Sequence, residues 1–474
     1  MSVSREQFGS RLGFILAAAG SAVGIGNLVG FPVAAAKHGG GAFLFIYAMF
    51  VLLVCLPVMM AELAVGRSSQ KNPLGAYRKL SEGSSLWPIA GWLVLITPYM
   101  IAVFYTVITI WLFGYLFEAA TGNLEQLANP DNFDSFVNSN TIFIYFIAVA
   151  ALVNLILVGG VKDGIERSVK IMMPALVVML IGLVIFVLTL DNAFAGVTYY
   201  LIPDFSKIDA RVINSALSQA FFSLSLGMGI MITYGSYMSR GEKIASSAKI
   251  IALTDTTVAF FAGLLIMPAI FAFNPDINTA DLSESSVGLM FTFLPKIFLA
   301  LQASIGYFGA SAVASIFFLL VFFAAITSLV SITEVPVSSL VGEKGYSRPK
   351  ALLVLTVTMG LISIACILSF GRIEWLSGFV TYADQSKSFF DVVIDVFYDT
   401  VLPLNGLLVC LFVIYRWKKH NFHQEMEVSD EAYQGTMVER YVDFSLSTFI
   451  PVILFLVFVN TVALKYFGVS FIGG

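Results

Sequence analysis

Eleven apolar stretches, each long enough to cross a membrane as a helix, constrain this chain more than any other feature of its sequence. A helical span needs about 20 mostly apolar residues, and the 474-residue chain is 58% hydrophobic and only 12% charged. We expect an all-α polytopic membrane protein with one transmembrane domain over residues 1–474. The expected spans are 11–36, 41–66, 88–119, 140–159, 167–190, 212–239, 247–273, 307–340, 349–370, 388–416 and 444–468.

The basic residues set the expected orientation of these spans. With the N-terminus in the cytoplasm, 19 of the 26 lysines and arginines fall in inner loops, which is what the positive-inside rule requires. A cleavable signal peptide at "RLGFILAAAGSA" is the alternative, but its removal would invert this bias. We therefore expect a multi-pass protein of the plasma (inner) membrane, with its C-terminus outside.

The polar residues indicate neither an enzyme nor a nucleic-acid binder. The three cysteines fall inside apolar spans, and the three histidines have no cysteine or carboxylate cluster around them, so a zinc site is not expected. No nucleophile–base pair or cofactor motif stands out, and no basic tract indicates nucleic acid.

Two of the expected spans are interrupted by glycine. The first contains "AAAGSAVGIGNLVGFP" (17–32), and the sixth contains "QAFFSLSLGMGIMITYGSY" (219–237). An interior glycine costs a helix about 1 kcal/mol, and unpaired backbone groups cost several more in hydrocarbon. Tight helix packing through GxxxG spacing is an alternative explanation for the first span. Two broken spans at corresponding positions instead favour a transporter built from inverted repeats, with its binding site at the breaks.

The spacing of the breaks divides the chain into two repeats of five spans. We expect the first repeat at 1–190, the second at 205–416 and an additional helix at 440–468. An odd number of spans gives the repeats opposite topologies. The freed N–H groups of a broken helix suit a carboxylate, and its freed carbonyls with nearby hydroxyls suit Na⁺.

Carboxylates inside apolar spans are candidates for function because each needs a partner there. Glu62 and Asp255 lie far from any basic residue in the sequence, so we expect them to bond freed backbone groups or a cation. Glu334 is a third candidate. Asp391 and Asp395 are four residues apart and share a helix face, where exposure to an aqueous vestibule is the alternative.

Together with "HGGGAFLF", "AELAVGR" and "FFAAITS", these stretches resemble the neurotransmitter:sodium symporter family, most closely its bacterial amino-acid branch with eleven spans. The resemblance covers residues 5–416. It implies the leucine-transporter fold, with discontinuous helices 1 and 6, and sodium-driven uptake by alternating access.

The resemblance also implies two sodium sites. The first would use Ala22, Asn27, Ser223 and Asp255, together with the substrate carboxylate. The second would use backbone oxygens of Gly20, Val23 and Ala324 and the hydroxyls of Thr327 and Ser328. A hydroxyl on a helix more commonly bonds back to its own backbone, which is the alternative for the last two residues.

The substrate site implied by the same match has an apolar, uncharged lining. It comprises Ala22, Gly24, Gly26, Ile101, Tyr105, Phe222, Ser225, Met228, Ser328 and Ile332. Relatives that carry monoamines have an aspartate at the position of Gly24, whereas glycine leaves space for the substrate's own carboxylate. A neutral, hydrophobic amino acid is therefore expected.

The chain departs from the family pattern at two positions. Many relatives have an arginine at the position of Gly30, paired with a tenth-span aspartate whose place is taken here by Asp395, or less closely by Asp391. This aspartate needs another partner, or the outer gate closes by packing of Phe222 over Tyr105.

The second departure concerns chloride. Chloride-dependent relatives have asparagine at the position of Asp255 and serine at that of Ala259. A fixed carboxylate would repel chloride there, so transport is expected to be chloride-independent.

Several residues match the family's inner gate and its release pathway. Arg5, Ser236 and Tyr237 resemble the inner-gate network, and Gly164 and Pro174 bracket a stretch whose local unwinding would let water reach the second sodium. We also assign Glu62 a role in gating or in the coupling of transport.

The alternatives are a proton-coupled transporter of the same fold, which would titrate Glu62 or Asp255, and a channel or sensor that binds the ligand without coupled transport. The expected partners are an amino acid, sodium ions and the lipid bilayer. One copy of the chain suffices for such transport, and the oligomeric state is left open.

Overall fold

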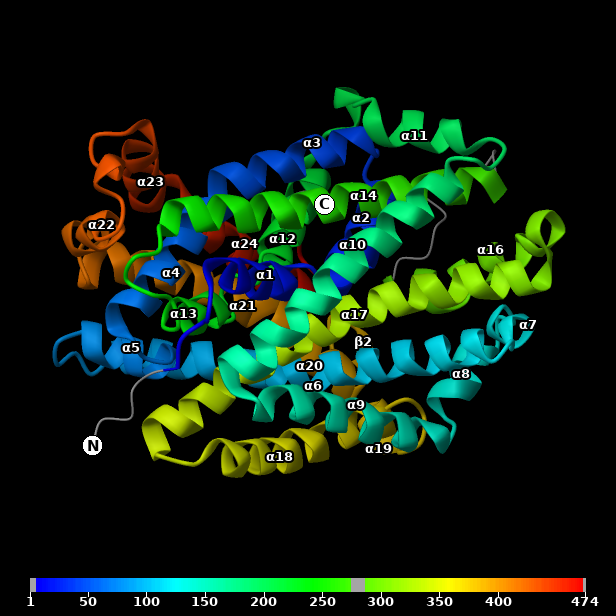
Figure 1. Cartoon of the computed structure of the whole chain (residues 1–474), viewed down its shortest axis with the longest axis horizontal. Coiled ribbons are helices and arrows are strands. Elements are labelled where there is room, and N and C mark those ends of the chain that lie inside the picture. The colour runs from blue at the N-terminus through cyan, green and yellow to red at the C-terminus, as the bar shows by residue number, and fades with distance from the viewer. Residues whose placement is uncertain (1–5, 274–285, 472–474) are drawn as a thin grey trace.

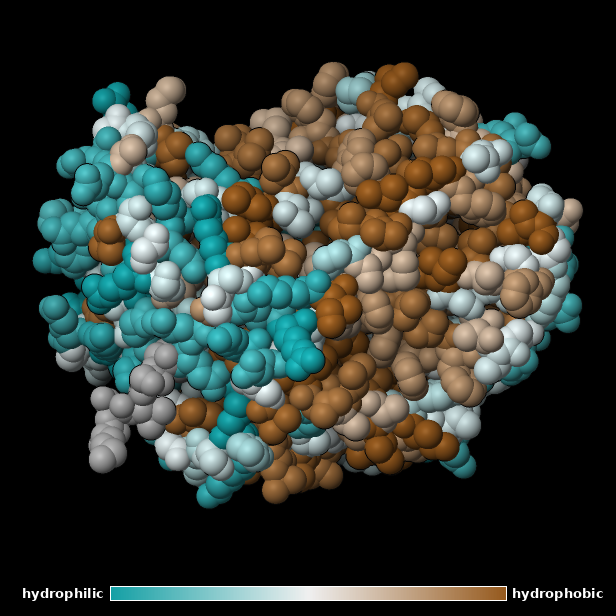
Figure 2. Space-filling model, in the orientation of Figure 1, coloured by the Kyte–Doolittle hydropathy of each residue, from teal (hydrophilic) through white to brown (hydrophobic). Residues whose placement is uncertain are grey.

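The computed structural model describes residues 6–273 and 286–471, and within these residues the fold is a helical bundle with one short β-hairpin (Figure 1). In Figure 2, hydrophilic residues gather at the end that carries α5 (Pro73–Leu80) and α22 (Lys419–Glu427), while hydrophobic residues cover the middle of the visible face. Such an apolar belt is the surface that a membrane-embedded bundle presents to lipid.

The first half of the described chain contains thirteen successive helical elements. They are α1 (Arg11–Ala22), η1 (Gly26–Gly30), α2 (Phe31–Lys37), α3 (Gly41–Phe50), η2 (Val51–Cys55), α4 (Leu56–Ser69), α5, α6 (Trp87–Ala120), α7 (Leu124–Leu127), α8 (Asn132–Val137), α9 (Thr141–Val158), η3 (Gly160–Glu166) and α10 (Arg167–Val187).

The second half adds the remaining helices and the antiparallel hairpin, in which Val380 pairs with Lys387. Its elements are α11 (Ala193–Leu201), η4 (Phe205–Lys207), α12 (Ala210–Ser223), α13 (Ile230–Gly235), α14 (Ile244–Phe273), α15 (Ser286–Gly288), η6 (Leu289–Phe293), α16 (Leu294–Ala300), α17 (Gln302–Lys344), α18 (Arg348–Leu368), α19 (Glu374–Ser377), β1 (Val380–Tyr382), β2 (Gln385–Lys387), α20 (Phe389–Val393), η7 (Ile394–Thr400), α21 (Val401–Leu411), η8 (Phe412–Arg416), α22, η9 (Glu431–Tyr433), α23 (Met437–Ser447) and α24 (Phe449–Phe467).

The membrane spans agree with the predicted pattern. Among the described residues, nine helical stretches are long and apolar enough to cross a membrane, and α1 with η1 and α2, bent by 52°, forms a tenth. The predicted sixth span corresponds to α12 and α13, which are short helices separated by residues 224–229. The predicted interruptions of the first and sixth spans are thus confirmed.

The two breaks have local causes in the backbone. Helix α1 is capped by Ser10, whose side chain accepts a hydrogen bond from the Gly13 amide, and it is followed by Val23, whose backbone is extended. Helix α12 ends where Ser225, Gly227 and Gly229 adopt positive φ angles of 55°, 74° and 68°. Glycine takes such angles without strain, so the second break follows directly from its two glycines.

Helix α17 connects the breaks to the rest of the bundle. It lies alongside α6 (Figure 1) and also contacts α1, α10 and α13. Thr327 and Ser328, in the middle of α17, therefore lie against the broken part of α1. A Cβ added to Gly20 would lie 3.5 Å from the Thr327 Cβ.

Close backbone packing holds α4 against the second broken span. A Cβ added to Gly66 would lie 2.0 Å from the Ile232 carbonyl oxygen and 2.9 Å from the Ser236 amide nitrogen. Both atoms belong to the backbone, so a side chain at this position would separate the two elements.

We expect Gly66→Ala to destabilise the protein by about 1–3 kcal/mol, the usual cost of overpacking, and to lower its melting temperature in detergent. The matched control is Gly182→Ala on the exposed face of α10, where nothing lies within 4 Å of the added Cβ. Equal melting temperatures for the two variants would contradict the close packing of α4 on α13.

Candidate functional site

The amides freed at the first break are bonded by side chains. The Gly24 N–H donates to Asn27 Oδ1 at 3.1 Å, and the Ile25 N–H donates to the Tyr105 hydroxyl oxygen at 3.2 Å. Asn27 belongs to η1 and Tyr105 to α6, so a local and a distant partner replace the lost helical bonds. Two N–H groups at the start of a half-helix form a site suited to an anion.

The carbonyls freed at the same break converge on one hydroxyl. Ser328 Oγ lies 3.4 Å from the Gly20 oxygen, 3.1 Å from the Ser21 oxygen and 3.4 Å from the Val23 oxygen. The Thr327 hydroxyl instead donates to carbonyls of its own helix, including Ala324 at 3.0 Å. The residues predicted for the second sodium site therefore lie together, and all their candidate ligand atoms are oxygens, which a hard cation prefers.

The second break is held by polar side chains from two other elements, α4 and α21, and by a contact with α1. The Gly227 N–H donates to Glu62 Oε1 at 2.7 Å, and the Gly227 oxygen accepts from the Asn405 amide at 2.9 Å. Ser225 donates to the Ser21 oxygen at 3.0 Å and so joins the two breaks. The prediction that Glu62 bonds freed backbone is confirmed.

Asp255 is the centre of a buried polar cluster beside the first break. Its carboxylate accepts hydrogen bonds from the Asn27 amide at 2.7 Å and from the Ser223 hydroxyl at 2.9 Å. The Tyr47 hydroxyl adds a third at 3.2 Å. The side chains predicted for the first sodium site thus lie together, whereas Tyr47 is an addition that sequence analysis missed, since a lone tyrosine in an apolar span gives no signal.

Gly24 allows Ser328 and Tyr105 to approach the broken helix closely. A Cβ there would lie 2.8 Å from Ser328 Oγ and 2.9 Å from the Tyr105 hydroxyl oxygen. The other side chains predicted to line the substrate site are buried: Ala22, Ile101, Phe222, Ser225, Met228 and Ile332 come from α1, α6, α12, the second break and α17, and all but the half-buried Phe222 are at most 4% exposed.

A cavity of about 560 Å³, here called the vestibule, adjoins this region. Its lining includes Gly26, Tyr105, Phe222, Tyr398 and Lys465. His38 also lines it, and burial lowers the pKa of its imidazole below the ordinary value.

The two predicted aspartates of the tenth span have different roles. Asp391 is exposed and forms a capping box with Ser388 at the start of α20. Asp395 is buried and pairs with Lys465 of α24 at 2.8 Å. Lys465 is therefore the partner that Asp395 was predicted to need in place of an arginine at position 30.

The aromatic partner of Phe222 at the outer gate differs from the predicted one. The Phe222 ring packs edge-on against Tyr398 with 4.3 Å between centroids. Packing of Phe222 over Tyr105 was the expectation; among the described residues the ring contact of Phe222 is with Tyr398 of η7 instead.

A second polar cluster lies toward the end of α17 that adjoins α18. The Tyr237 hydroxyl donates to Glu334 Oε1 at 2.6 Å, and Arg348 pairs with Glu334 at 2.5 Å and with Glu6 at 3.5 Å. Tyr237 and Glu334 were expected from the sequence, whereas Arg348 was not, because it stands there only as one basic residue of an inner loop.

The remaining gate predictions fall near this cluster or outside the described residues. Ser236 donates to the Thr233 oxygen at 2.6 Å, and Arg5 lies outside the described residues. The segment that was expected to unwind is a π-helix only over Gly160–Glu166, and α10 continues through Pro174 as a helix. Gly164 is required there, because a Cβ would lie 2.0 Å from the Ile156 oxygen.

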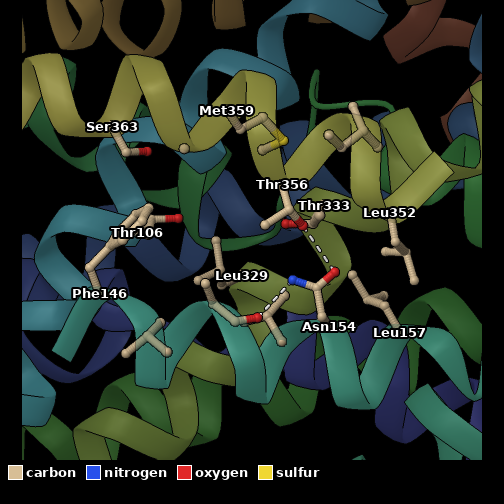
Figure 3. A pocket seen from close by; sticks show the side chains of 15 residues that line it. Thr106, Phe146, Asn154, Leu157, Leu329, Thr333, Leu352, Thr356, Met359 and Ser363 are labelled. Atoms are coloured by element: carbon tan, nitrogen blue, oxygen red, sulfur yellow. Dashed lines mark hydrogen bonds between the residues drawn. The ribbon is translucent and has the colours of Figure 1, made fainter. Parts of the chain in front are cut away.

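A separate small cavity of about 50 Å³ lies among α6, α9, α17 and α18 (Figure 3). Asn154 accepts a hydrogen bond from the Thr356 hydroxyl there at 3.0 Å and donates to the Ala150 oxygen at 2.8 Å. Ligand sites usually enclose about 300–1,000 Å³, so we interpret this cavity as a gap between packed helices that contains a few polar groups. None of its lining residues belongs to either break.

Comparison with known proteins gives one family. The model of the Sodium:neurotransmitter symporter family matches residues 5–141 and 126–469. The uncharacterized sodium-dependent transporter YhdH of Bacillus subtilis is 33% identical over 467 residues, covering 97% of this chain and 98% of that protein. A counterpart from Haemophilus influenzae is 30% identical over 478 residues, covering 96% and 98%.

A solved structure agrees with the sequence match. The crystal structure of MhsT in complex with L-phenylalanine is 36% identical, has a TM-score of 0.83 and covers 96% of this chain and 99% of its own. The fold around the two breaks is therefore the leucine-transporter fold. The chain belongs to the Sodium:neurotransmitter symporter family and is a sodium-dependent membrane transporter rather than an enzyme.

Proposed function

We propose that this protein imports a neutral, hydrophobic amino acid together with sodium by alternating access, and that it does so without chloride. The observation that carries the proposal is the contact between the two breaks, where Ser225 donates to the Ser21 oxygen. Freed amides and freed carbonyls of the first break lie in the same buried region, beside Ser328 and Tyr105. The proposal includes a plasma-membrane location with the N-terminus in the cytoplasm and the C-terminus outside.

The substrate carboxylate would bind at the start of the half-helix η1. The amides of Gly24 and Ile25, now bonded to Asn27 and Tyr105, would turn to the ligand, and the Tyr105 hydroxyl would become a donor. Binding of L-phenylalanine by MhsT supports an apolar side chain, as does the burial of Ile101 in the proposed lining.

Two sodium ions would occupy the oxygen-rich regions on either side of the break. One would lie among Asn27, Ser223 and Asp255, and the other among the carbonyls that now surround Ser328. Each ion would join α1 to a distant helix, so binding would favour one arrangement of the bundle. Two charges moved inward supply about 4–5 kcal/mol per 100 mV, at ~2.3 kcal/mol for each.

Release toward the cytoplasm would require the cluster of Tyr237, Glu334 and Arg348 to separate. These groups join the helix after the second break to α17 and α18. The π-helical turn with Gly164 lies beside the N-terminal segment, where Glu166 accepts the Gly9 amide at 2.6 Å. Loosening of that turn would open a path for water to the second sodium.

Proton coupling remains the second candidate because Glu62 is fully buried and one of its carboxylate oxygens has no hydrogen-bond partner among the described residues. A sodium gradient should drive concentrative uptake of the amino acid into proteoliposomes even with no pH gradient. Replacement of sodium by choline should abolish it. Uptake that follows a pH gradient in choline would instead support proton coupling, and uptake that stops at equilibrium would indicate a channel.

Ser328→Ala should raise the sodium concentration for half-maximal uptake by about tenfold, corresponding to ~1.4 kcal/mol, because it removes a proposed ligand. The control is Ser315→Ala on the same helix, whose hydroxyl donates only to the Ser311 oxygen. A sodium dependence that is the same in both variants would argue against the second sodium site.

The chloride proposal rests on the buried carboxylate of Asp255. Uptake should be equal in chloride and in gluconate for the native protein. The double variant Asp255→Asn/Ala259→Ser should acquire a chloride requirement, since it exchanges a fixed negative charge for a site that an anion can fill. Ala259→Ser alone serves as the control, and a native requirement for chloride would refute the proposal.

A further inference from the structure

A lysine on α24 bridges two carboxylates on η7. Lys465 Nζ lies 2.8 Å from Asp395 Oδ1 and 2.7 Å from Asp399 Oδ2. The side chain of Asp395 is 6% exposed and that of Asp399 is 23% exposed. Because the two acids lie close together, loss of the ammonium would leave like charges facing each other in a poorly solvated place.

Further contacts hold the same turn to α24 and to the β-hairpin. The Tyr382 hydroxyl donates to Asp395 Oδ2 at 2.6 Å, and the Tyr382 ring packs on Tyr466 with 5.1 Å between centroids. The Tyr466 hydroxyl lies 3.2 Å from the Thr400 hydroxyl. The position of η7 therefore depends on α24, the helix that lies outside both proposed repeats.

This turn carries the aromatic side of the vestibule. Tyr398 lies between Asp395 and Asp399 in the π-helix, and its ring contacts Phe222 of α12 at 4.3 Å and Phe104 of α6 at 5.9 Å. Phe222 in turn covers Gly26: a Cβ added to Gly26 would lie 2.9 Å from the Phe222 ring. The contact of Tyr398 with Phe222 thus joins the tenth span to the broken sixth span directly beside the first break.

Position 30, on the opposite wall of the vestibule, carries no charge. Gly30 carries no side chain, and a Cβ added there would lie 3.4 Å from Gln219 Oε1. Gln219 donates to the Gly26 oxygen at 2.8 Å. An ion pair from position 30 to η7 is therefore replaced by a contact between aromatic rings.

We propose that the outer gate of this transporter is the Phe222–Tyr398 contact, and that Lys465 is a positioning residue that holds Tyr398 in place by bridging Asp395 and Asp399. The proposal rests on the transport function inferred above. Under this proposal the eleventh span, through Lys465, contributes to the outer gate.

The first test is a double-variant cycle on transport. Lys465→Met should raise the KM for the amino acid by roughly fivefold to tenfold and change kcat by less than about twofold, while Lys465→Arg should keep the native KM. If Lys465 acts through Tyr398, then Lys465→Met/Tyr398→Ala should have the KM of Tyr398→Ala alone. Additive effects on KM would overturn the proposal.

The matched control is Lys37→Met, which removes another lysine that lines the vestibule without touching the two acids. Its KM should be native. An equal rise in KM for Lys37→Met and Lys465→Met would show that the vestibule needs positive charge in general and would overturn the positioning role.

The second test needs no transport. Ser215→Cys places a thiol in the vestibule wall, and the three native cysteines are buried. Its rate of labelling by an uncharged thiol reagent, in sodium without substrate, should rise about threefold or more in Lys465→Met and return toward the native rate when Asp399→Asn is added. Unchanged labelling would overturn the gate proposal. If the native protein takes up the amino acid without sodium coupling while the labelling rates change as expected, only the proposed function is overturned.

Discussion

Backbone groups that lose their helical partners inside a membrane must find others, and this constraint organises the whole structure. In hydrocarbon each unsatisfied group costs several kcal/mol, so the two broken helices exist only because other elements supply partners. Tyr105, Glu62, Asn405 and Ser328 do so from four different helices. The bundle around the breaks can therefore be understood as the set of helices needed to keep those partners in position.

The supply of partners at the first break is uneven. One Ser328 hydroxyl, with a single proton, faces the carbonyl oxygens of Gly20, Ser21 and Val23. The Ser225 hydroxyl also donates to the Ser21 oxygen, so two hydroxyl protons face three carbonyl oxygens, whereas a cation can bind all three. The excess of acceptors over donors gives a physical reason for a sodium-dependent protein to leave this helix broken.

Three of the buried carboxylates, Asp255, Glu62 and Glu334, solve the same problem in different ways. Asp255 is surrounded by side-chain donors, Glu62 receives a backbone amide, and Glu334 is paired with an arginine. Only the last has a full countercharge, which suits a contact that has to open and close again. The other two are held by dipoles, which are fixed parts of the local structure.

The fold followed from the sequence because hydropathy and glycine placement act over short distances. The breaks near Gly24 and Gly227 were visible as glycines in apolar runs, and the side chains of the proposed sodium sites were identified through the family motifs. Tyr47, Arg348 and Lys465 were not found, since their roles arise from pairing across the fold; Asp395 and Lys465 are separated by 70 residues. No local pattern records such a pairing.

That separation bears on how the chain assembles in the membrane. Asp395 and Asp399 are synthesised well before Lys465, so the tenth span first meets the bilayer with two acids and no cation. Each uncompensated charge opposes insertion by roughly 2.5–3.5 kcal/mol at the helix centre. In the folded protein α24 supplies a cation to both acids, so the eleventh helix offsets a cost that the tenth would otherwise carry in the bilayer.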